Sequence, residues 1–559
     1  MRFSGEGGQG VVTASDMLAR AGASVGYHVQ TFATFPSQIL GGPTWTQTRL
    51  SVNLVLSPGD YLDVLVAFNN DAFEEHKSEV QQDGVILYNS SEFTPAFDGL
   101  AIGLPLKELA KEAGDPRAAN MVILGALSKL VDMPLKYFED FVRSRFIGRQ
   151  AIIESNIKGL SLGNTNVNAD EFHIGALVEP KKSKETLVFL KGNDALSLGA
   201  MQAGLDFYAG YPISPATPIL VFMQKNLLGP GKFAYQVSSE IESINAILGA
   251  GYAGKKAMTA TAGPGLSLMS EGIGLAWMAE IPCVIIDVQR GGPATGLPTK
   301  TEQSDLTAAI HPAHGDVTIP VIAPGTVEEC FYAMIDALNW AEKSQCPVIL
   351  LSDHSLAERS QDFVKPDLSK INIDERLIYK GSNGYNRYEA KGISPMPIPG
   401  NPGAYIANGS EHDYVGDTTH KGSHHIHMTE RRFSKLKLLD SYPYERLNRS
   451  QSVALMPWGG SKGSALEAYN LLKKESIEIS WYYTMYLNPL SSDLIHELQK
   501  KDLVLVPELN YQGQFSSILR SEGIKAESIT QYTGLPFKVK DLVKIISERI
   551  ETHKKEIVV

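Results

Sequence analysis

Two charged residues, Glu240 and Arg290, stand where a charge could do chemistry. Glu240 opens the apolar, small-residue run EIESINAILGAGYAG, and a carboxylate that folding buries needs a partner or a catalytic task. Arg290 ends the buried-strand pattern VIIDVQ, at the edge where open α/β sheets bind ligands, and a guanidinium there can clamp a carboxylate with two hydrogen bonds. An ordinary interpretation of each stays open: a first-turn acid that favours the helix dipole, and a surface arginine at a strand end.

A third candidate is Ser214 in GYPISPATP, residues 210–218. The prolines of this segment restrict the backbone, so we expect the Ser214 hydroxyl to be held in one place. Pro215 suits a first helical turn and Ser214 suits an N-cap, and the alternative that Ser214 is only a cap stays open.

Two glycine turns each follow a predicted strand and precede a predicted helix: GEGGQG at 5–10 and GPG at 263–265. Such turns present backbone N–H groups to an anion. The first matches G-x-G-x-x-G, but a dinucleotide site also needs an acidic residue about 20 positions on. The window 25–40 contains none, which disfavours a nicotinamide site. A ligand-free turn and a different anionic ligand both remain open for residues 5–10.

Short apolar strands alternate with helical patterns along the chain, and this alternation is typical of an α/β protein. In the first block we expect strands at 62–68 and 84–89 and helices at 11–24 and 118–131, followed by a polar connector at 151–184. A second connector, 366–450, is too long for an ordinary loop, so we expect it to pack over the other blocks. The elements expected in the other two blocks are helices at 194–204, 240–254, 266–279, 326–342 and 464–474, one further helix starting near 215, and strands at 185–190, 257–262, 281–288, 347–352, 452–457, 477–485 and 502–507.

Composition excludes several functions. The 559 residues carry a formal net charge of −11, which argues against a nucleic-acid surface or a basic membrane patch. No apolar run approaches the roughly 20 residues of a membrane span, and no signal peptide is expected. The three cysteines include no C-x-x-C pair, so we expect no four-cysteine iron–sulfur or zinc site in this chain and a reducing, cytoplasmic setting.

Three further patterns are given little weight. The histidines of the segment 412–427 have no standard metal-site spacing, and no metal site is predicted. GGSKGS at 459–464 lacks the spacing of a phosphate-binding loop. Glu508, Asn510 and Gln514 in PELNYQGQ are expected to pack against another subunit or simply to start a helix.

Taken together, GYPISPATP, TATAGPGLSLMSEG, DVQRGGPATGLPTKTEQSDL and PELNYQGQ resemble the alpha subunit of the 2-oxoacid:ferredoxin oxidoreductases, of the 2-oxoglutarate type. GEGGQG, with FPSQILGG at 35–42 and DVLVAFN at 63–69, resembles the gamma domain of that family, here fused ahead of the alpha part. The resemblance implies three α/β domains: a gamma domain at 1–180, a domain of the pyrimidine-binding type found in thiamine diphosphate enzymes at 185–365, and, after the connector 366–450, a transketolase-C-terminal-like domain at 451–559.

This family decarboxylates a 2-oxoacid on thiamine diphosphate with Mg²⁺, transfers the acyl group to coenzyme A and passes electrons to ferredoxin through iron–sulfur clusters. The chain lacks the G-D-G…N pattern of a diphosphate–magnesium site as well as cluster cysteines. The resemblance therefore implies a beta subunit that holds the diphosphate, Mg²⁺ and a cluster, and a dimer of alpha–beta units. No nucleic acid or membrane partner is expected.

Roles carry over by motif. Glu240 matches the glutamate that bonds the aminopyrimidine ring and favours its imino tautomer, and Arg290 matches the arginine that neutralises the substrate carboxylate. Ser214 stands where relatives have Thr, and Thr299 and Lys300 are further substrate candidates. The resemblance puts Tyr211, Pro212, Ile213, Gly263 and Gly265 on the pyrimidine side of the cofactor, and Gly7, Gly8, Gln9 and Gly10 near coenzyme A.

Rival functions stay open at this point. The substrate could instead be pyruvate, a branched-chain oxoacid or an aryl-pyruvate, and the sequence specifies neither the oxoacid nor the physiological direction. A stand-alone NAD-dependent dehydrogenase would use the 5–10 turn. A non-catalytic homologue would pair with a beta chain and turn nothing over.

Overall fold

The structure is a computed structural model that describes residues 1–34, 42–168, 177–180 and 185–558. The chain divides into two compact units. Unit one comprises Met1–Leu190 and Arg359–Pro366, and unit two comprises Lys191–Glu358 and Asp367–Val559. The segment 35–41, which contributes to the gamma-domain resemblance, lies outside the described residues.

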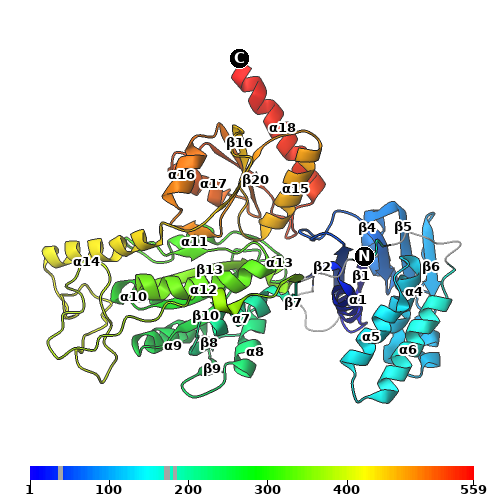
Figure 1. Cartoon of the computed structure of the whole chain (residues 1–559), viewed down its shortest axis with the longest axis horizontal. Coiled ribbons are helices and arrows are strands. Elements are labelled where there is room, and N and C mark those ends of the chain that lie inside the picture. Colours follow the sequence, from blue (N-terminus) through cyan, green and yellow to red (C-terminus); the bar gives the residue numbers. More distant parts are fainter. Residues whose placement is uncertain (35–41, 169–176, 181–184, 559) are drawn as a thin grey trace. The chain divides into compact units, whose positions relative to one another are not determined.

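Unit one is built on a mixed eight-stranded sheet (Figure 1). Strands β1, β4, β5 and β6 run parallel, whereas β3 runs antiparallel to both β1 and β2. The strand order is β6 (Leu100–Leu104), β5 (Val80–Asn89), β4 (Leu62–Ala67), β1 (Arg2–Glu6), β3 (Pro43–Ser51), β2 (His28–Thr34), β14 (Ser360–Val364) and β7 (Leu187–Lys191).

The helices expected in unit one are confirmed as α1 (Val11–Val25) and α4 (Ala119–Leu130). The polar connector expected from residue 151 is wrong over its first part, where helix α6 (Gln150–Thr165) packs against α4. The buried positions of this helix are Ile153, Asn156, Gly159, Leu160 and Gly163. Asparagine or glycine fills three of these five, so the helical period is hard to see in the sequence. The remaining helices are α2 (Asn70–His76), α3 (Leu106–Ala113) and α5 (Leu135–Arg145).

Unit two contains a seven-stranded sheet whose strands from β12 to β9 all run parallel. Its strands β10, β11 and β13 are buried along their whole length, as inner strands of a parallel sheet are. The order is β18 (Tyr486–Asn488), β12 (Val321–Ile322), β13 (Pro347–Asp353), β11 (Cys283–Gln289), β10 (Ala257–Thr261), β8 (Phe207–Gly210) and β9 (Phe233–Gln236). The expected helices are confirmed within a few residues as α7 (Gly192–Gln202), α8 (Thr217–Asn226), α9 (Glu240–Tyr252), α10 (Gly263–Ala279) and α12 (Val327–Ser344), and a short helix α11 (Leu306–Ile310) is added.

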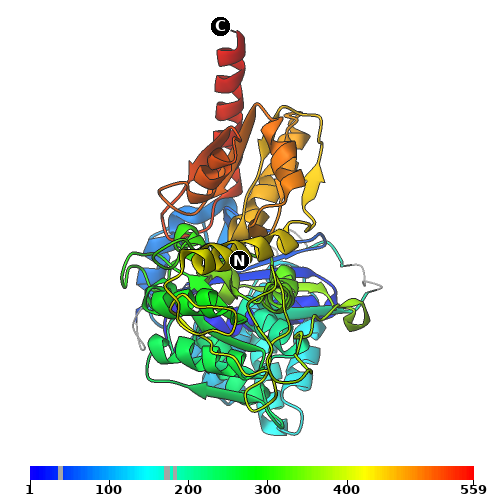
Figure 2. The same cartoon turned by 90° about the vertical axis from the view of Figure 1, so that its left-hand side faces the viewer.

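Apart from β18, the strands from residue 445 onwards form a third, five-stranded sheet in the same unit. Its last helix, α18 (Val539–Val558), extends beyond this sheet in both views (Figures 1 and 2). The strand order is β15 (Glu445–Leu447), β17 (Ser480–Tyr483), β16 (Val453–Leu455), β19 (Leu503–Glu508) and β20 (Ala526–Thr530), with helices α15 (Lys462–Lys474), α16 (Ser492–Gln499) and α17 (Gln514–Ser521). The prediction of an α/β fold is confirmed.

Four strands differ from the expected block boundaries. β15 comes from the expected connector and joins the third sheet, and β18 comes from the last block and joins the seven-stranded sheet. β7 and β14, at the two ends of the block 185–365, both belong to the sheet of unit one. β14 pairs antiparallel with β2, with Gln361 opposite Gln30. A strand's choice of sheet depends on residues far away in the sequence, so none of these assignments could be made locally.

The segment 366–450 packs onto unit two, as expected, and carries helix α14 (Gly422–Ser434). Its anchor is Glu280, which is fully buried and accepts from Arg431 Nε at 2.9 Å and Lys435 Nζ at 2.8 Å. Burial alone would raise the pKa of Glu280, but Lys435, Arg431 and Arg387 lower it below its usual range. The carboxylate therefore stays charged and holds the segment in place.

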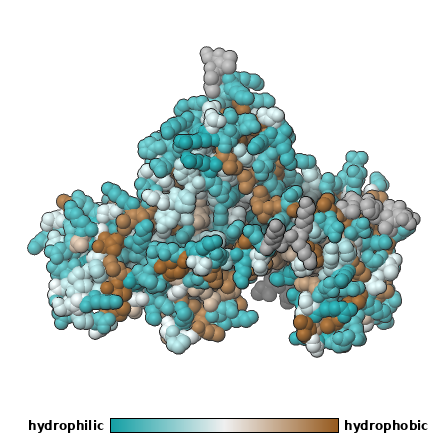
Figure 3. Space-filling view, viewed as in Figure 1, coloured by the Kyte–Doolittle hydropathy of each residue, from teal (hydrophilic) through white to brown (hydrophobic). Residues whose placement is uncertain are grey.

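On the face seen in Figure 3, hydrophilic residues predominate and hydrophobic ones form small separate patches, as on an ordinary protein surface. Among the described residues, no helix is long and apolar enough to span a bilayer.

Candidate active site

Four neighbouring parallel strands of unit two, in the order β11, β10, β8 and β9, end at one edge of the sheet. Each leads directly into one of the predicted site segments. Arg290 follows β11, Gly263 follows β10, the segment 211–214 follows β8, and Glu240 lies four residues beyond β9. The topology thus gathers residues that are up to 80 positions apart in the sequence, at the edge where α/β sheets bind ligands.

Arg290 is 7% exposed and reaches across to the segment after β8, where its Nη1 donates to the Ser214 carbonyl at 2.6 Å. Nε is buried without a hydrogen-bond partner, and no carboxylate of the described residues lies within 4.0 Å of the guanidinium. Burial lowers the Arg290 pKa, whereas Asp287 and Asp305 act to raise it. A guanidinium that is held by a neutral carbonyl keeps its charge available for an anionic ligand.

Glu240 begins helix α9 and is only 5% exposed. Neighbouring residues, and not Glu240, cap this helix end. Ser239 Oγ accepts from the Glu242 N–H at 3.2 Å, and Glu242 Oε2 accepts from the Ser238 N–H at 2.7 Å. The Glu240 carboxylate accepts no hydrogen bond from any described residue. The interpretation of Glu240 as a mere first-turn acid is therefore the weaker one, because a buried carboxylate without an internal partner suits an external donor.

Gly263 and Gly265 lie against polar side chains of neighbouring segments. A Cβ on Gly265 would stand 2.0 Å from Thr261 Oγ1 and 2.7 Å from Glu240 Oε1. A Cβ on Gly263 would stand 2.8 Å from Asp305 Oδ2. Any larger residue at these two positions would collide with Thr261, Glu240 or Asp305.

The expected N-cap at Ser214 is wrong. Helix α8 begins at Thr217 with Ala216 as its cap residue, and the turn closes through Ala216 N–H to the Ile213 carbonyl at 2.8 Å. Ser214 is exposed, and its hydroxyl makes no hydrogen bond with a described residue. The hydroxyl is therefore open to a ligand. Of the other residues in this segment, Tyr211 is 39% exposed, and Pro212 and Ile213 are half-buried.

Thr299 and Lys300 end the loop that follows Arg290 and are both half-buried. The Gly291 N–H donates to the Lys300 carbonyl at 3.0 Å, so the loop returns to its own start. The stem of Lys300 lies against Gly534, where a Cβ would be 2.8 Å from Lys300 Cβ. Their role toward a substrate stays a prediction.

Two acidic residues near this edge, Asp287 and Asp305, were not predicted from the sequence. Asp287 lies inside β11, opposite Thr261 of β10, and is fully buried. Asp305 precedes α11, and its Oδ2 is buried. A charged residue within the apolar run VIIDVQ is a signal that could have drawn attention to Asp287.

The segment PELNYQGQ packs within this chain, so the expected packing of its polar residues against another subunit is wrong for Glu508, Asn510 and Gln514. Glu508 caps α17, accepting from the Phe515 N–H at 2.7 Å. Asn510 and Gln514 hold the segment before α11, through Asn510 Nδ2 to the Gln303 carbonyl at 3.0 Å and Gln514 Nε2 to the Ser304 carbonyl at 2.6 Å. The third sheet thus fixes the segment that carries Asp305.

The 5–10 turn belongs to unit one and joins β1 to α1. Gly8 and Gly10 adopt φ of 100° and 90°, which favour glycine. Gln9 folds back, and its Oε1 accepts from the Glu6 N–H at 2.7 Å. Residues 6–9 are exposed. The turn is thus a tight strand-to-helix connection, and its part in ligand binding remains a prediction.

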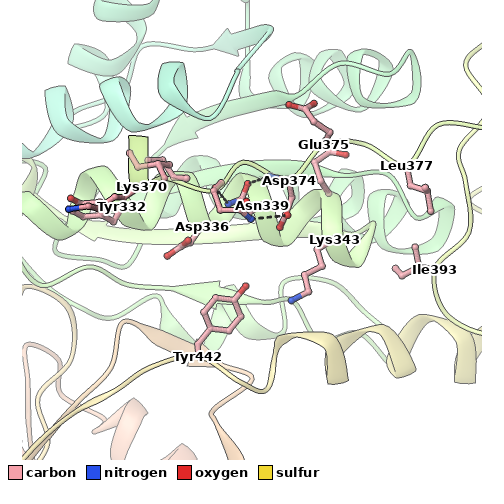
Figure 4. A pocket seen from close by; sticks show the side chains of 14 residues that line it. Tyr332, Asp336, Asn339, Lys343, Lys370, Asp374, Glu375, Leu377, Ile393 and Tyr442 are labelled. Atoms are coloured by element: carbon pink, nitrogen blue, oxygen red, sulfur yellow. Dashed lines mark hydrogen bonds between the residues drawn. The ribbon is translucent and has the colours of Figure 1, made fainter. Parts of the chain in front are cut away.

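Other features lie outside this cluster. Lys462 of GGSKGS is paired with Glu329 and with Glu445, so it is not poised for phosphate. Among the described residues no group of three potential ligands could hold a metal, the histidines of 412–427 included. A pocket of about 580 Å³ between α12 and the segment 370–377 has Asp336 and Tyr442 in its wall and none of the predicted site residues (Figure 4).

Residues 198–431 match the family described as pyruvate flavodoxin/ferredoxin oxidoreductase, thiamine diphosphate-binding, and residues 1–165 match pyruvate ferredoxin/flavodoxin oxidoreductase. The 2-oxoglutarate oxidoreductase subunit KorA of Mycobacterium tuberculosis is 30% identical over 98% of this chain and 90% of its own length. The chain belongs to the 2-oxoacid:ferredoxin oxidoreductases.

Further relatives agree with this membership. The alpha subunit of 2-oxoacid:ferredoxin oxidoreductase 2 from Aeropyrum pernix is 29% identical over 100% of this chain and 98% of its own. The 2-oxoglutarate:ferredoxin oxidoreductase of Magnetococcus marinus, solved with 2-oxoglutarate, coenzyme A and succinyl-CoA bound, is 38% identical, with a TM-score of 0.92 over 98% of this chain and 99% of that chain. The chain is thus an alpha subunit of this oxidoreductase family and works in a multi-subunit enzyme.

Family membership connects the residues at this sheet edge with thiamine diphosphate. The thiamine diphosphate-binding match, 198–431, contains Ser214, Glu240, Gly263, Gly265 and Arg290. The donor set fits the cofactor: the unpartnered buried carboxylate of Glu240 can accept from an aminopyrimidine, and Gly265 leaves room for the Glu240 side chain. The rival hypothesis of a stand-alone NAD-dependent dehydrogenase is overturned by the family membership.

Proposed function

We propose that this chain is the fused gamma–alpha subunit of a 2-oxoglutarate:ferredoxin oxidoreductase. The enzyme would convert 2-oxoglutarate, coenzyme A and two oxidised ferredoxins reversibly into succinyl-CoA, CO₂ and two reduced ferredoxins. The observation that carries the choice of oxoacid is the likeness to the Magnetococcus marinus enzyme, at 38% identity over nearly the whole of both chains.

Arg290 would bind the substrate carboxylate next to the reacting keto carbon. Its side chain is oriented by the Ser214 carbonyl and has no anionic partner within 4.0 Å among the described residues, so substrate binding would supply the missing anion. The exposed Ser214 hydroxyl would donate to the same carboxylate, with Thr299 and Lys300 as further contacts from the loop.

Glu240 would hold the aminopyrimidine of thiamine diphosphate, with Gly263, Gly265 and the segment 211–213 beside it. When bound, the cofactor supplies the carbon nucleophile and electron sink that decarboxylation of a 2-oxoacid requires. Glu240 accepts the N–H of the ring and shares its proton, and its burial keeps water from competing for this hydrogen bond.

A beta subunit would hold the diphosphate, Mg²⁺ and an iron–sulfur cluster, since this chain carries neither the sequence pattern nor the cysteines for them. The assembly would be a dimer of alpha–beta units. Coenzyme A would dock near Gly7, Gly8, Gln9 and Gly10, where an exposed turn precedes a helix N-terminus. Replacing Gly8 should then raise the KM for coenzyme A without affecting the KM for the oxoacid.

The test is reduction of a viologen by the assembled enzyme with a panel of 2-oxoacids. We expect the highest kcat/KM with 2-oxoglutarate. Higher kcat/KM with pyruvate, a branched-chain oxoacid or an aryl-pyruvate would change the substrate but not the enzyme class. A complete enzyme that turned over none of them would favour a non-catalytic homologue.

A further inference from the structure

A group of buried polar atoms without hydrogen-bond partners belongs to Arg290 and to two nearby acidic residues. Both carboxyl oxygens of Asp287, one of Asp305 and the Nε of Arg290 are buried, and none has a hydrogen-bond partner among the described residues. Asp287 is fully buried and Arg290 is 7% exposed. Polar atoms in such surroundings are costly unless they are satisfied, so this cluster calls for an explanation.

Asp305 lies on the same side of β11 as Asp287, because its N–H donates to Gln289 Oε1 and residues two apart in a strand share a face. Two carboxyl groups can hydrogen-bond to each other only if one of them carries a proton, because two carboxylates offer acceptors alone. The backbone fixes this pairing from both sides. Asp287 stands in mid-strand, and the Asp305 N–H donates to Gln289 Oε1 at 3.1 Å, on the same strand.

The pair connects to both halves of the candidate active site. Arg290 follows Asp287 by three residues at the end of β11, and Asp305 Oδ2 lies beside Gly263, where a Cβ would be 2.8 Å away. The segment that carries Asp305 is held in turn by Gln514, which accepts from the Thr307 N–H at 3.0 Å. The pair is therefore a fixed feature of the site.

We propose that Asp287 and Asp305 share one proton and act together as positioning residues for Arg290. With one proton between them the pair carries a single negative charge. That charge orients the guanidinium from behind without pairing with it, and the positive charge is left for the substrate carboxylate. Two ionised carboxylates would draw the guanidinium inward, and two neutral carboxyls would leave it without an anion behind it.

The charged surroundings agree with this protonation. Burial first, and then the charge of Asp305, raises the pKa of Asp287 well above its usual range, against the opposing effect of Arg290. Burial and Glu302 raise the pKa of Asp305 to about 6, although the hydrogen bond from Asp287 and the charge of Arg290 oppose this. The residues opposite Asp287 on β10 and β13, Thr261 and Leu351, do not titrate.

The inference rests on the proposed function, and its first test is kinetic. Asp287→Ala removes the donor and leaves Asp305 as a buried carboxylate, so the KM of the assembled enzyme for its 2-oxoacid should rise about tenfold with a smaller change in kcat. Asp287→Asn keeps an N–H donor toward Asp305 and the single negative charge, so it should recover the KM to within about threefold of wild type. If Asn raised the KM as much as Ala does, Asp287 would be ionised and the proposal would fail.

Arg290→Ala in the same assay separates the proposal for the Asp287–Asp305 pair from the proposed role of Arg290 in substrate binding. If Arg290→Ala raises the KM but Asp287→Ala does not, the paired-carboxyl proposal is wrong, whereas the binding of the substrate carboxylate by Arg290 is supported. If Arg290→Ala also leaves the KM unchanged, the proposed role of Arg290 in substrate binding fails.

A second test remains informative if Asp287→Ala does not fold. In the wild type, folded Asp287 keeps a proton that the unfolded chain loses above about pH 4, so wild-type stability falls as the pH rises toward the folded pKa. Asp287→Asn has no such titration, and its Tm relative to wild type should therefore increase steadily from pH 5 to pH 8. A difference in Tm that is constant over this range would overturn the shared proton.

Asp336→Asn is the matched control. Asp336 belongs to the pocket wall of Figure 4, accepts from the Tyr486 hydroxyl at 2.7 Å, and has a pKa that burial raises to about 6. Its Tm relative to wild type should increase between pH 4 and pH 6 and then level off, and its oxoacid KM should not change. If its KM rose like that of Asp287→Ala, the kinetic effect would be a general result of removing a buried carboxyl and the proposal would fail.

Discussion

The turns at 5–10 and 263–265 have the same design, a strand followed by glycines and a helix, yet their glycines serve different needs. In the first turn, Gly8 and Gly10 take positive φ, and no described atom lies within 4 Å of a Cβ placed on Gly8. In the second turn, neither Gly263 nor Gly265 has a positive φ, but a Cβ on either would collide with a functional side chain.

The difference shows that a glycine motif alone does not identify a site. The first turn needs glycine at positions 8 and 10 for its backbone shape, and at position 10 also for space beside Asn120. Its exposed polar groups are partly satisfied by its own Gln9. The second needs glycine because Glu240, Thr261 and Asp305 occupy the space around it. What distinguishes the turn of the proposed active site is the set of side chains that other segments bring to it.

The largest effect is expected when the Glu240 carboxylate, which lies beside Gly265 of the second turn, is removed. Glu240→Ala should lower the kcat of the assembled enzyme by about 100-fold or more, because proton sharing with the aminopyrimidine is lost. Initial rates of viologen reduction measure this. A kcat close to wild type would remove the functional distinction between the two turns.

Gly265→Ala should lower kcat by about tenfold or more, because the added methyl would displace Glu240. Gly249→Ala, at a site in α9 with no described atom within 4 Å of the new Cβ, is the matched control and should leave kcat unchanged. Equal rates for both variants would show that the space beside Gly265 is not needed.

Arg290→Lys should raise the KM for the oxoacid about tenfold with little change in kcat, since an ammonium cannot keep both the bond to the Ser214 carbonyl and a two-pronged contact with a carboxylate. A KM equal to wild type would mean that the substrate carboxylate binds elsewhere.

Substitutions in the first turn should affect stability more than chemistry. Gly8→Ala should cost about 1–2 kcal/mol through its positive φ alone. Gly10→Ala should cost more, because its Cβ would also lie 2.5 Å from the Asn120 amide. Thermal unfolding and the oxoacid KM together check this. A raised oxoacid KM with unchanged stability would show that the first turn acts in oxoacid binding and not in stability.

Much of the second unit could be predicted because its elements are local. The runs that became α9, β10 and β11 carry their own apolar period, and Glu240 and Arg290 follow from their places at the ends of those runs. Ser214 was placed in the right segment, but its capping role was wrong, since the helix begins three residues later at Thr217.

What could not be predicted depends on distant partners. β14 joins a sheet through β2, more than 300 residues earlier in the sequence. Asp287 gains its significance only when folding brings Asp305 next to it. The beta subunit that the proposed function requires would complete a site of which this sequence gives one side.

The most direct test of the central claim is the rate at which the thiazolium C2 proton of bound thiamine diphosphate exchanges with deuterated solvent, measured by acid quench and NMR. The comparison is between the wild-type assembled enzyme and Glu240→Gln. The account predicts exchange slowed by about 100-fold or more with cofactor binding retained. Exchange at the wild-type rate, with the cofactor bound, would contradict the assignment of Glu240 and with it the active site described in this chain.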